Sequence, residues 1–348
     1  MAWRSKEFRM SPFLYLFLIQ TVMPLDHYVS QVHLRKFYSP ALGNRMYAIR
    51  KADLKAFTPN SESVCRVMDG STNAYLLKDR MIEDFLNTIE PNYNSALENL
   101  TSGKIDNNCI YAIAGFVAYI ATCSPAGMRI QSMPLKRMVE HEAVVMDAQG
   151  AFPPPPAVLG GASLTELLRD GAVKVMIDPK YPQAIGIDSI LEFINIFGNC
   201  KWEILQNDFK DSPFFTSDFP IAIEKTSDPR VLNRIVPLAP NLAVRIKPDI
   251  SIDRTQIDLS FPKFSCVSRH IGHGDVVKIN TLLVRCAEDT VFYRDNPSWV
   301  QPFIRKNQHY RIETCSKELK TTTGTLLFST QRVVAIVPPV EPTRASVD

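Results

Sequence analysis

The sequence lacks the short motifs that would assign it to a well-known enzyme class. The glycine-rich phosphate loop, the GxGxxG dinucleotide motif, the HExxH zinc motif and the GxSxG nucleophile motif are all absent. Each motif carries a particular chemistry, so their absence removes the enzyme classes that depend on them. No internal repeat occurs either.

The chain also lacks an excess of charge of one sign and lacks paired cysteine motifs. Its 39 basic and 36 acidic side chains leave a formal net charge of +3. Composition therefore gives no argument for a general nucleic-acid or membrane-surface binder, although it does not exclude a local basic groove. The seven cysteines are scattered, without a CxxC pair. This pattern favours buried thiols in a reducing cytosol over a disulfide framework or a zinc site.

The N-terminal region lacks an apolar run long enough to cross a bilayer. Arg4, Lys6 and Arg9 precede an apolar segment at residues 12–23. This resembles a signal peptide, but no small-residue cleavage site follows it. We interpret residues 1–22 as an extension outside the core of a cytoplasmic protein. Residues 339–348 are predicted to be a disordered tail.

The order of the patterns predicts an α+β fold with a mixed or antiparallel sheet and a mostly helical middle region. We expect a single domain at 23–338, with a helical block at 80–200 and a strand-rich second half at 201–338. The segment at 110–122 is apolar nearly all round, which predicts a buried helix. Helices are also expected at 128–146 with a break at Pro134, and at 163–168, 187–197 and 276–287. Strands are expected at 45–49, 54–57, 64–68, 201–205, 214–217, 221–224, 235–238, 242–246, 325–329 and 333–337, and residues 270–273 are expected to form a loop.

One stretch, at residues 26–37, combines polar and apolar side chains at regular spacing. His27, Gln31 and Arg35 recur every four residues, so a single helical face would present them together. They form a candidate cluster for a phosphate or carboxylate group, with His27 as general acid or base. The alternative is architectural: His27 bonds a backbone carbonyl and Arg35 pairs with a buried carboxylate.

Other candidate groups follow later in the chain. Ser217 and Asp218 lie where a predicted strand meets an X-Pro turn, a position that often carries a site but is also common in simple turns. Glu83 and Glu90 are seven residues apart and share a helical face unless Pro91 breaks the helix first. These two carboxylates could hold a divalent metal or act as acid and base, whereas a solvated helix face is the plainer interpretation.

These motifs and their order resemble domain-of-unknown-function family 4238, whose signature is HYVPQ. The resemblance covers roughly Met23 to Tyr293, and its matches include 27–31, 47–51, 216–220 and 237–240. Asn280 and Arg285 resemble a polar pair on the family's late helix. The family carries no settled activity, so the resemblance implies none for this chain.

Two departures from the family pattern bear on the site. Ser30 stands where the family usually has Pro, and Ser can replace Pro there as a helix cap. Cys123 stands where the family often has Arg, and this removes a charge that could have paired with Asp218 or a glutamate. Mechanisms that require every polar group of the family are therefore weakened.

The residues leave two functions open. The first is a hydrolase acting on a phosphodiester or another anionic substrate, such as a nuclease acting on RNA, DNA or a nucleotide, with a divalent metal as a possible cofactor. The second is a non-enzymatic ligand- or partner-binding protein that uses the same cluster for recognition or architecture. Both predict that the opening stretch meets the 216–220 segment, because Asp218 is the acceptor that His27 and Arg35 lack locally. The assigned roles are catalytic for His27 and Asp218, substrate-binding for Gln31, Arg35, Ser217 and Asn280, and unassigned for Glu83, Glu90 and Arg285.

We expect a variant that begins at Met23 to be as thermally stable as the full chain, because residues 1–22 match neither the strand nor the helix patterns of the core. Thermal unfolding of the two proteins under identical conditions measures this. A large drop in melting temperature would show that the apolar segment at 13–19 packs against the domain.

Overall fold

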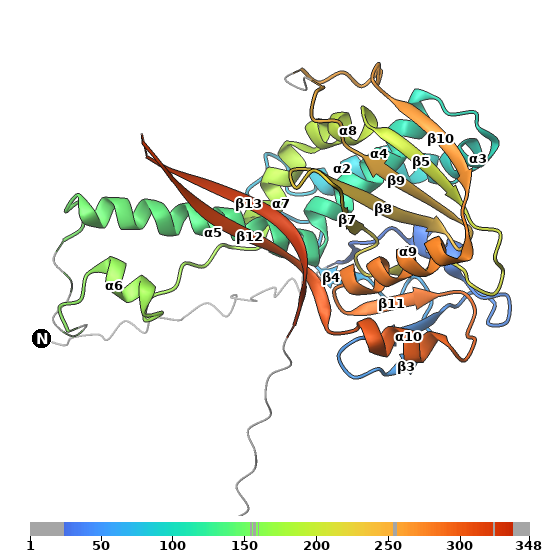
Figure 1. The fold of residues 1–348 in the computed structure, drawn as a ribbon, viewed down its shortest axis with the longest axis horizontal. Coiled ribbons are helices and arrows are strands. Elements are labelled where there is room, and N and C mark those ends of the chain that lie inside the picture. Colours follow the sequence, from blue (N-terminus) through green and yellow to red (C-terminus); the bar gives the residue numbers. More distant parts are fainter. Residues whose placement is uncertain are drawn as a thin grey trace, which may run out of the picture.

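The structure is a computed structural model that describes residues 24–336, apart from residues 154, 156, 157, 159, 253–255 and 323. The predictions for residues 1–22 and 339–348 lie outside the described residues. Figure 1 shows a body that contains most of the helices and two sheets, and an arm that projects from it. The arm contains helix α5 (Pro125–Ala148), helix α6 (Leu164–Arg169) and the hairpin of β12 (Tyr310–Thr321) and β13 (Gly324–Ala335).

Two sheets form the body, and they confirm the predicted α+β class. A five-stranded sheet has the order β10-β5-β9-β8-β7, in which only β10 and β5 are parallel neighbours. A four-stranded antiparallel sheet has the order β3-β2-β11-β6, and a separate short pair joins β1 to β4. These strands are β1 (Leu25–His27), β2 (Tyr47–Arg50), β3 (Ala56–Phe57), β4 (Arg66–Met68), β5 (Lys201–Gln206), β6 (Thr216–Ser217), β7 (Ala222–Lys225), β8 (Leu232–Ala239), β9 (Leu242–Lys247), β10 (Ser265–His270) and β11 (Thr290–Tyr293).

Most of the helices lie in the middle of the sequence, as predicted. They are α1 (Gln31–Leu34), α2 (Met81–Ile89), α3 (Tyr93–Ser102), α4 (Asn107–Cys123), α7 (Lys180–Asp188), α8 (Ile190–Gly198), α9 (His273–Cys286) and α10 (Val300–Asn307), with 3-10 helices η1 (Arg35–Phe37) and η2 (Glu90–Asn92). Within the described part of the chain, no single helix is long and apolar enough to cross a membrane. Helices α4 and α5 meet that test only as a pair, bent by 62°.

Helix α4 is the centre of the main core. Asp106 caps it, since its carboxylate accepts a hydrogen bond from the N–H of Cys109 at 2.7 Å. Apolar residues then occupy almost every position, and Phe116 is only 1% exposed. A helix that is apolar all round must be buried, and α4 packs against α2, α3, α5, α7 and α8. The predicted burial of residues 110–122 is confirmed.

Helix α5 is continuous through Pro134, whereas the sequence predicted a break there. Proline has no N–H, so the carbonyl of Ile130 loses its usual partner in the helix. The hydroxyl of Thr314, on the hairpin, donates to that carbonyl at 2.8 Å. A side chain distant in sequence thus replaces the missing bond, and it also fixes the hairpin against α5.

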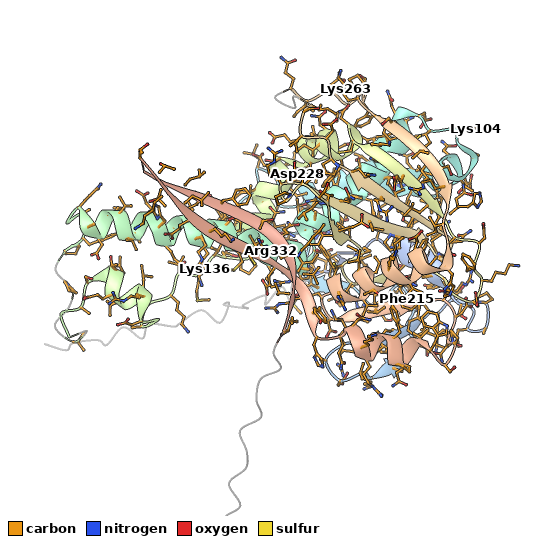
Figure 2. All side chains as sticks on the ribbon, viewed as in Figure 1. Lys104, Lys136, Phe215, Asp228, Lys263 and Arg332 are labelled. Carbon is orange, nitrogen blue, oxygen red and sulfur yellow. The ribbon has the colours of Figure 1, made fainter. Side chains whose placement is uncertain are left out.

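The β12–β13 hairpin is anchored to the body at its base. Lys51 is buried, and its ammonium group donates to the carbonyls of Ala287 and Tyr310 at 2.5 and 2.7 Å. Burial lowers the pKa of Lys51 to about 8. The two strands then pair over their full length. Figure 2 labels Lys136 on α5 and Arg332 on β13 within the arm.

Several elements differ from their predictions. The loop expected at 270–273 contains the end of β10 and the start of α9, and β11, β12 and α10 were not predicted. The strands expected at 45–49, 54–57 and 64–68 do not lie in one sheet: β2 pairs with β3, whereas β4 pairs with β1. The helix expected at 187–197 is divided at Ser189 into α7 and α8.

We expect Phe116→Ala to lower the free energy of unfolding by about 3–5 kcal/mol, because the change leaves a cavity at the centre of the core. Denaturant titration measures the loss. Phe328→Ala, at a site on β13 that is 44% exposed, is the matched control and should change stability by less than about 1 kcal/mol. Equal effects of the two substitutions would contradict the central position of α4.

Candidate functional site

His27, Gln31 and Arg35 line one cavity, but they reach it from three elements instead of one helical face. His27 ends β1, Gln31 begins α1, and Arg35 begins η1. Because a strand precedes the helix, the helical step that the sequence suggested between His27 and Gln31 does not exist. The chain nevertheless bends so that all three side chains line a cavity of about 510 Å³.

Two carboxylates, those of Glu83 and Glu90, line the same cavity. Glu83 lies on α2, and Glu90 begins η2, directly before Pro91. Pro91 lies in the 3-10 helix η2, which directly continues α2, and both glutamates line the cavity. Five candidates from two separate parts of the sequence are therefore brought together. The complete lining is Leu25, Asp26, His27, Gln31, Val32, Arg35, Glu83, Leu86, Asn87, Glu90 and Pro91.

Arg35 is the cationic group of the cavity. Its Nη2 donates to Gln31 Oε1 at 2.9 Å, and the same oxygen accepts a hydrogen bond from Ser61 Oγ at 3.2 Å. Arg35 forms no ion pair with any residue that the structure describes. A guanidinium whose only partner is a neutral amide retains N–H groups that can bind a carboxylate or phosphate in a fork.

His27 supplies the imidazole ring of the cavity. The hydroxyl of Tyr119 donates to the backbone carbonyl of His27 at 2.8 Å, which fixes the chain at this point. Within the described structure, the ring atom Nε2 is buried and has no hydrogen-bond partner. Burying a polar atom without a partner costs free energy.

Asp26 lies beside His27, but it is committed to an ion pair. Arg80 Nη1 lies 2.9 Å from its carboxylate, which also accepts the N–H of Ser71 at 2.9 Å. Burial raises the pKa of Asp26, but the hydrogen bonds from Arg80 and Ser71 outweigh burial and hold the pKa below its usual value. Arg80 also lies 3.6 Å from Glu83, so one guanidinium offsets the charge of two carboxylates at this side of the cavity.

The opening stretch and the 216–220 segment meet through His33 and Thr216. His33 is fully buried, with Nδ1 2.8 Å from the Tyr93 hydroxyl and Nε2 2.8 Å from the Thr216 hydroxyl. Its ring stacks on Phe116 at a centroid distance of 4.9 Å. Burial lowers the pKa of His33 to about 3, so the ring is neutral at pH 7. The two segments make contact, but through residues that the sequence did not single out.

Asp218 is not among the residues that line the cavity. Its carboxylate accepts three backbone N–H bonds, from Glu288, Asp289 and Thr290, at 2.7 to 3.0 Å. Burial raises the pKa of Asp218 to about 7, despite these three donors. The contacts fix the turn between α9 and β11. A catalytic role for Asp218 stays a prediction.

The remaining candidates make local structural contacts. Ser217 Oγ accepts the N–H of the residue two positions later at 3.1 Å, as in a common turn. The Asn280 amide bonds two backbone groups in the segment before β6, at 2.9 and 3.0 Å. Arg285 donates to Asn307 at 2.8 Å, and its guanidinium lies 4.4 Å from the centre of the Tyr310 ring.

Sequence reasoning missed two residues of the site. Asn87 lies four residues after Glu83, so helical spacing alone would have placed it on the cavity face. Ser30 precedes α1, and its hydroxyl donates to Glu90 instead of capping the helix. In the part of the chain described here, no three His, Cys, Asp or Glu side chains are placed to hold a metal ion.

The fold and the cavity together define an α+β protein with a polar, histidine-containing cavity between its first helix and α2. The chain belongs to the family described as "Protein of unknown function (DUF4238)", whose model matches residues 26–297. The match confirms the resemblance found in the sequence motifs. It includes every residue of the cavity except Leu25 and ends before α10 and the β12–β13 hairpin. Searches of curated proteins and of solved structures find no match.

We expect His33 to make the protein less stable as the pH falls. Its pKa is 6.5 when unperturbed and about 3 in the fold. Between these values the unfolded chain binds a proton that the folded chain does not, so stability is lost progressively below pH 6.5. Asp218 acts in the opposite sense. Its pKa is 3.8 when unperturbed and about 7 in the fold, so the stability that its protonation contributes at low pH is lost as the pH rises to about 7.

Comparison with His33→Gln isolates the histidine contribution, because glutamine does not titrate and Asp218 is common to both proteins. Denaturant unfolding at pH 7 and pH 4.5 should show that the parent loses about 2–3 kcal/mol more than the variant. The variant will be less stable at both pH values, so the relevant measurement is how much unfolding free energy each protein loses between pH 7 and pH 4.5. Equal losses in the two proteins would contradict a neutral, buried His33.

Proposed function

We propose that this protein is a hydrolase that acts on a phosphodiester or another anionic substrate in the cavity lined by His27, Arg35 and Glu90. One observation carries the proposal. A histidine with an unpartnered ring nitrogen, an arginine without an ion pair and two glutamates line a single cavity of about 510 Å³ in the described structure. General acid–base hydrolysis of an anionic substrate uses groups of these types.

Each group has a role that follows from its contacts. Arg35, with Gln31, binds the anionic group of the substrate and offsets the charge that develops there. The imidazole ring of His27 accepts a proton from a water molecule as the water oxygen bonds to the reacting centre. The bond to the leaving group then breaks, and His27 returns the proton to the leaving oxygen. Glu90 stabilises the positive charge of the intermediate imidazolium and takes the place of Asp218 as the second catalytic group.

The size and polarity of the cavity support a small anionic substrate. A volume of about 510 Å³ lies within the range of about 300–1,000 Å³ for small-molecule sites. A nucleotide, or the end of an RNA or DNA strand, is of this size and carries the phosphate that Arg35 would bind. The acidic wall at Glu83 and Glu90 disfavours a long polyanion, so we favour the mononucleotide.

We also propose a cytoplasmic location. The seven cysteines lie in the described part of the chain and form no disulfide, and five of them are buried. Such a pattern supports a reducing compartment. The location is compatible with either function of the cavity.

A non-enzymatic binding role is the second candidate, and the pairing within the cavity favours it. Gln31 already accepts bonds from Arg35 and Ser61, and Glu90 already accepts the Ser30 hydroxyl. Groups that are paired before a ligand arrives are typical of recognition or architectural clusters as well as of active sites. Such a protein would bind a phosphate-bearing ligand without turning it over.

We expect His27→Ala to lower turnover by about 10²- to 10⁴-fold, because general acid–base catalysis contributes that much. The unfolding midpoint should hardly change, since the ring forms no hydrogen bond within the described structure. The assay is a screen of the full-length protein against single-stranded RNA, DNA and nucleotides, with and without Mg²⁺ or Mn²⁺. His141→Ala, on α5 in the arm, is the matched control.

Asp218→Asn separates the cavity mechanism from a mechanism in which Asp218 is the catalytic carboxylate. It weakens an acceptor of three backbone N–H groups, so stability should fall by about 1–3 kcal/mol and activity only with the folded fraction. Loss of turnover at unchanged stability would restore Asp218 as the catalytic carboxylate. Binding of a nucleotide without turnover would favour the non-enzymatic role.

A further inference from the structure

Ser30 stands at the start of α1 but does not cap it. Its backbone is extended, with φ −52° and ψ 132°, and its side chain makes no bond to the first turn of the helix. A serine at this position usually accepts a hydrogen bond from an N–H two or three residues later. Here the carbonyl of Ser30 accepts the N–H groups of His33 and Leu34, at 3.1 and 3.2 Å, and the hydroxyl is directed elsewhere.

The hydroxyl of Ser30 donates to Oε1 of Glu90, which is 60 positions away in the sequence. Ser30 is 2% exposed and does not line the cavity, whereas Glu90 is half-buried and does. The donor is therefore inside the protein, behind the cavity wall. A hydrogen bond to a carboxylate is stronger than one between neutral groups, so it restricts the rotamers of Glu90 and leaves Oε2 for the cavity.

The two glutamates of the cavity differ in the kind of partner that holds them. Glu83 lies 3.6 Å from the guanidinium of Arg80, so a cation offsets its charge. Glu90 is held by a neutral hydroxyl and forms no ion pair with any described residue. A neutral donor positions a carboxylate without cancelling its charge. Glu90 therefore retains the charge that an imidazolium or another cationic group in the cavity would meet.

We propose that Ser30 is a positioning residue for Glu90: its hydroxyl holds the carboxylate in the orientation in which the free oxygen faces the cavity. The effect on turnover rests on the proposed function. The positioning itself does not, because it concerns the orientation of a carboxylate in the resting protein. The competing explanation is that the bond only ties the start of α1 to η2 and has no influence on the chemistry of Glu90.

Three variants distinguish these explanations. Ser30→Ala removes the hydroxyl. Ser30→Thr retains a hydroxyl on the same carbon and should rescue the effect. Ser30→Pro removes the hydroxyl as well, and the φ of −52° at this position is close to the value that a proline ring imposes. Ser30→Pro therefore serves as a second test if Ser30→Ala folds poorly.

The first readout needs no substrate. The folded full-length proteins are treated with a water-soluble carbodiimide and glycine ethyl ester, and modification of Glu90 relative to Glu83 is measured by peptide mass spectrometry. A carboxylate released from its donor should react about tenfold faster, the factor that corresponds to one hydrogen bond to a charged group. We expect this increase in Ser30→Ala and Ser30→Pro and the parent rate in Ser30→Thr.

The second readout applies once a substrate is turned over. Ser30→Ala should lower kcat by about tenfold with little change in KM, because the lost interaction acts in the transition state. Ser30→Thr should restore kcat. In a Glu90→Gln background, Ser30→Ala should have no further effect on kcat, since the hydroxyl acts through that carboxylate.

The proposal is overturned if Glu90 labels at the same rate in all four proteins, or if Ser30→Thr behaves as Ser30→Ala. It is also overturned if Ser30→Ala lowers kcat further in the Glu90→Gln background. Failure of the proposed function gives a different result. In that case no nucleotide or nucleic acid is hydrolysed, while the labelling of Glu90 still responds to Ser30 as described.

Discussion

A neutral histidine at the centre of the molecule connects its helical and strand-rich halves. Each ring nitrogen of His33 contacts one hydroxyl, from Tyr93 in the helical block and from Thr216 in the second sheet. A neutral imidazole has one donor and one acceptor, and two hydroxyls can match both. Helix α1 has only four residues and could not be stable alone. Its position, and with it the position of Gln31 and Arg35, therefore depends on this buried contact.

The cavity is built from the ends of elements instead of from their regular interiors. A strand end supplies His27, short helical turns supply Gln31 and Arg35, and a helix tightened before a proline supplies Glu90. The ends of helices and strands leave backbone groups and side chains less constrained by regular hydrogen bonding, which suits a polar site. The rigid part of the site is the core beneath it, where α4 and His33 pack.

The sequence was sufficient for features that depend on local patterns. The apolar helix α4 and the short helix α6 follow from spacing and residue type alone. The sequence was insufficient where a distant residue changes a local structure. Thr314, for example, donates to the Ile130 carbonyl, which Pro134 cannot bond because proline has no N–H. His27, Gln31 and Arg35 line one cavity, but His27 reaches it from a strand and not from the helical face that the spacing predicted. The bonds of Ser30 to Glu90 and of His33 to Thr216 join residues too far apart for a single sequence to reveal.

Lys51 links two parts of the molecule that the family match separates. Its ammonium group joins the carbonyl of Tyr310, beyond the matched residues 26–297, to that of Ala287 within them. Ala287 directly precedes the turn whose N–H groups Asp218 holds. The base of the arm and this turn are thus both attached to Lys51. A substitution at Lys51 would therefore disturb the arm and this turn together, without removing a residue that lines the cavity.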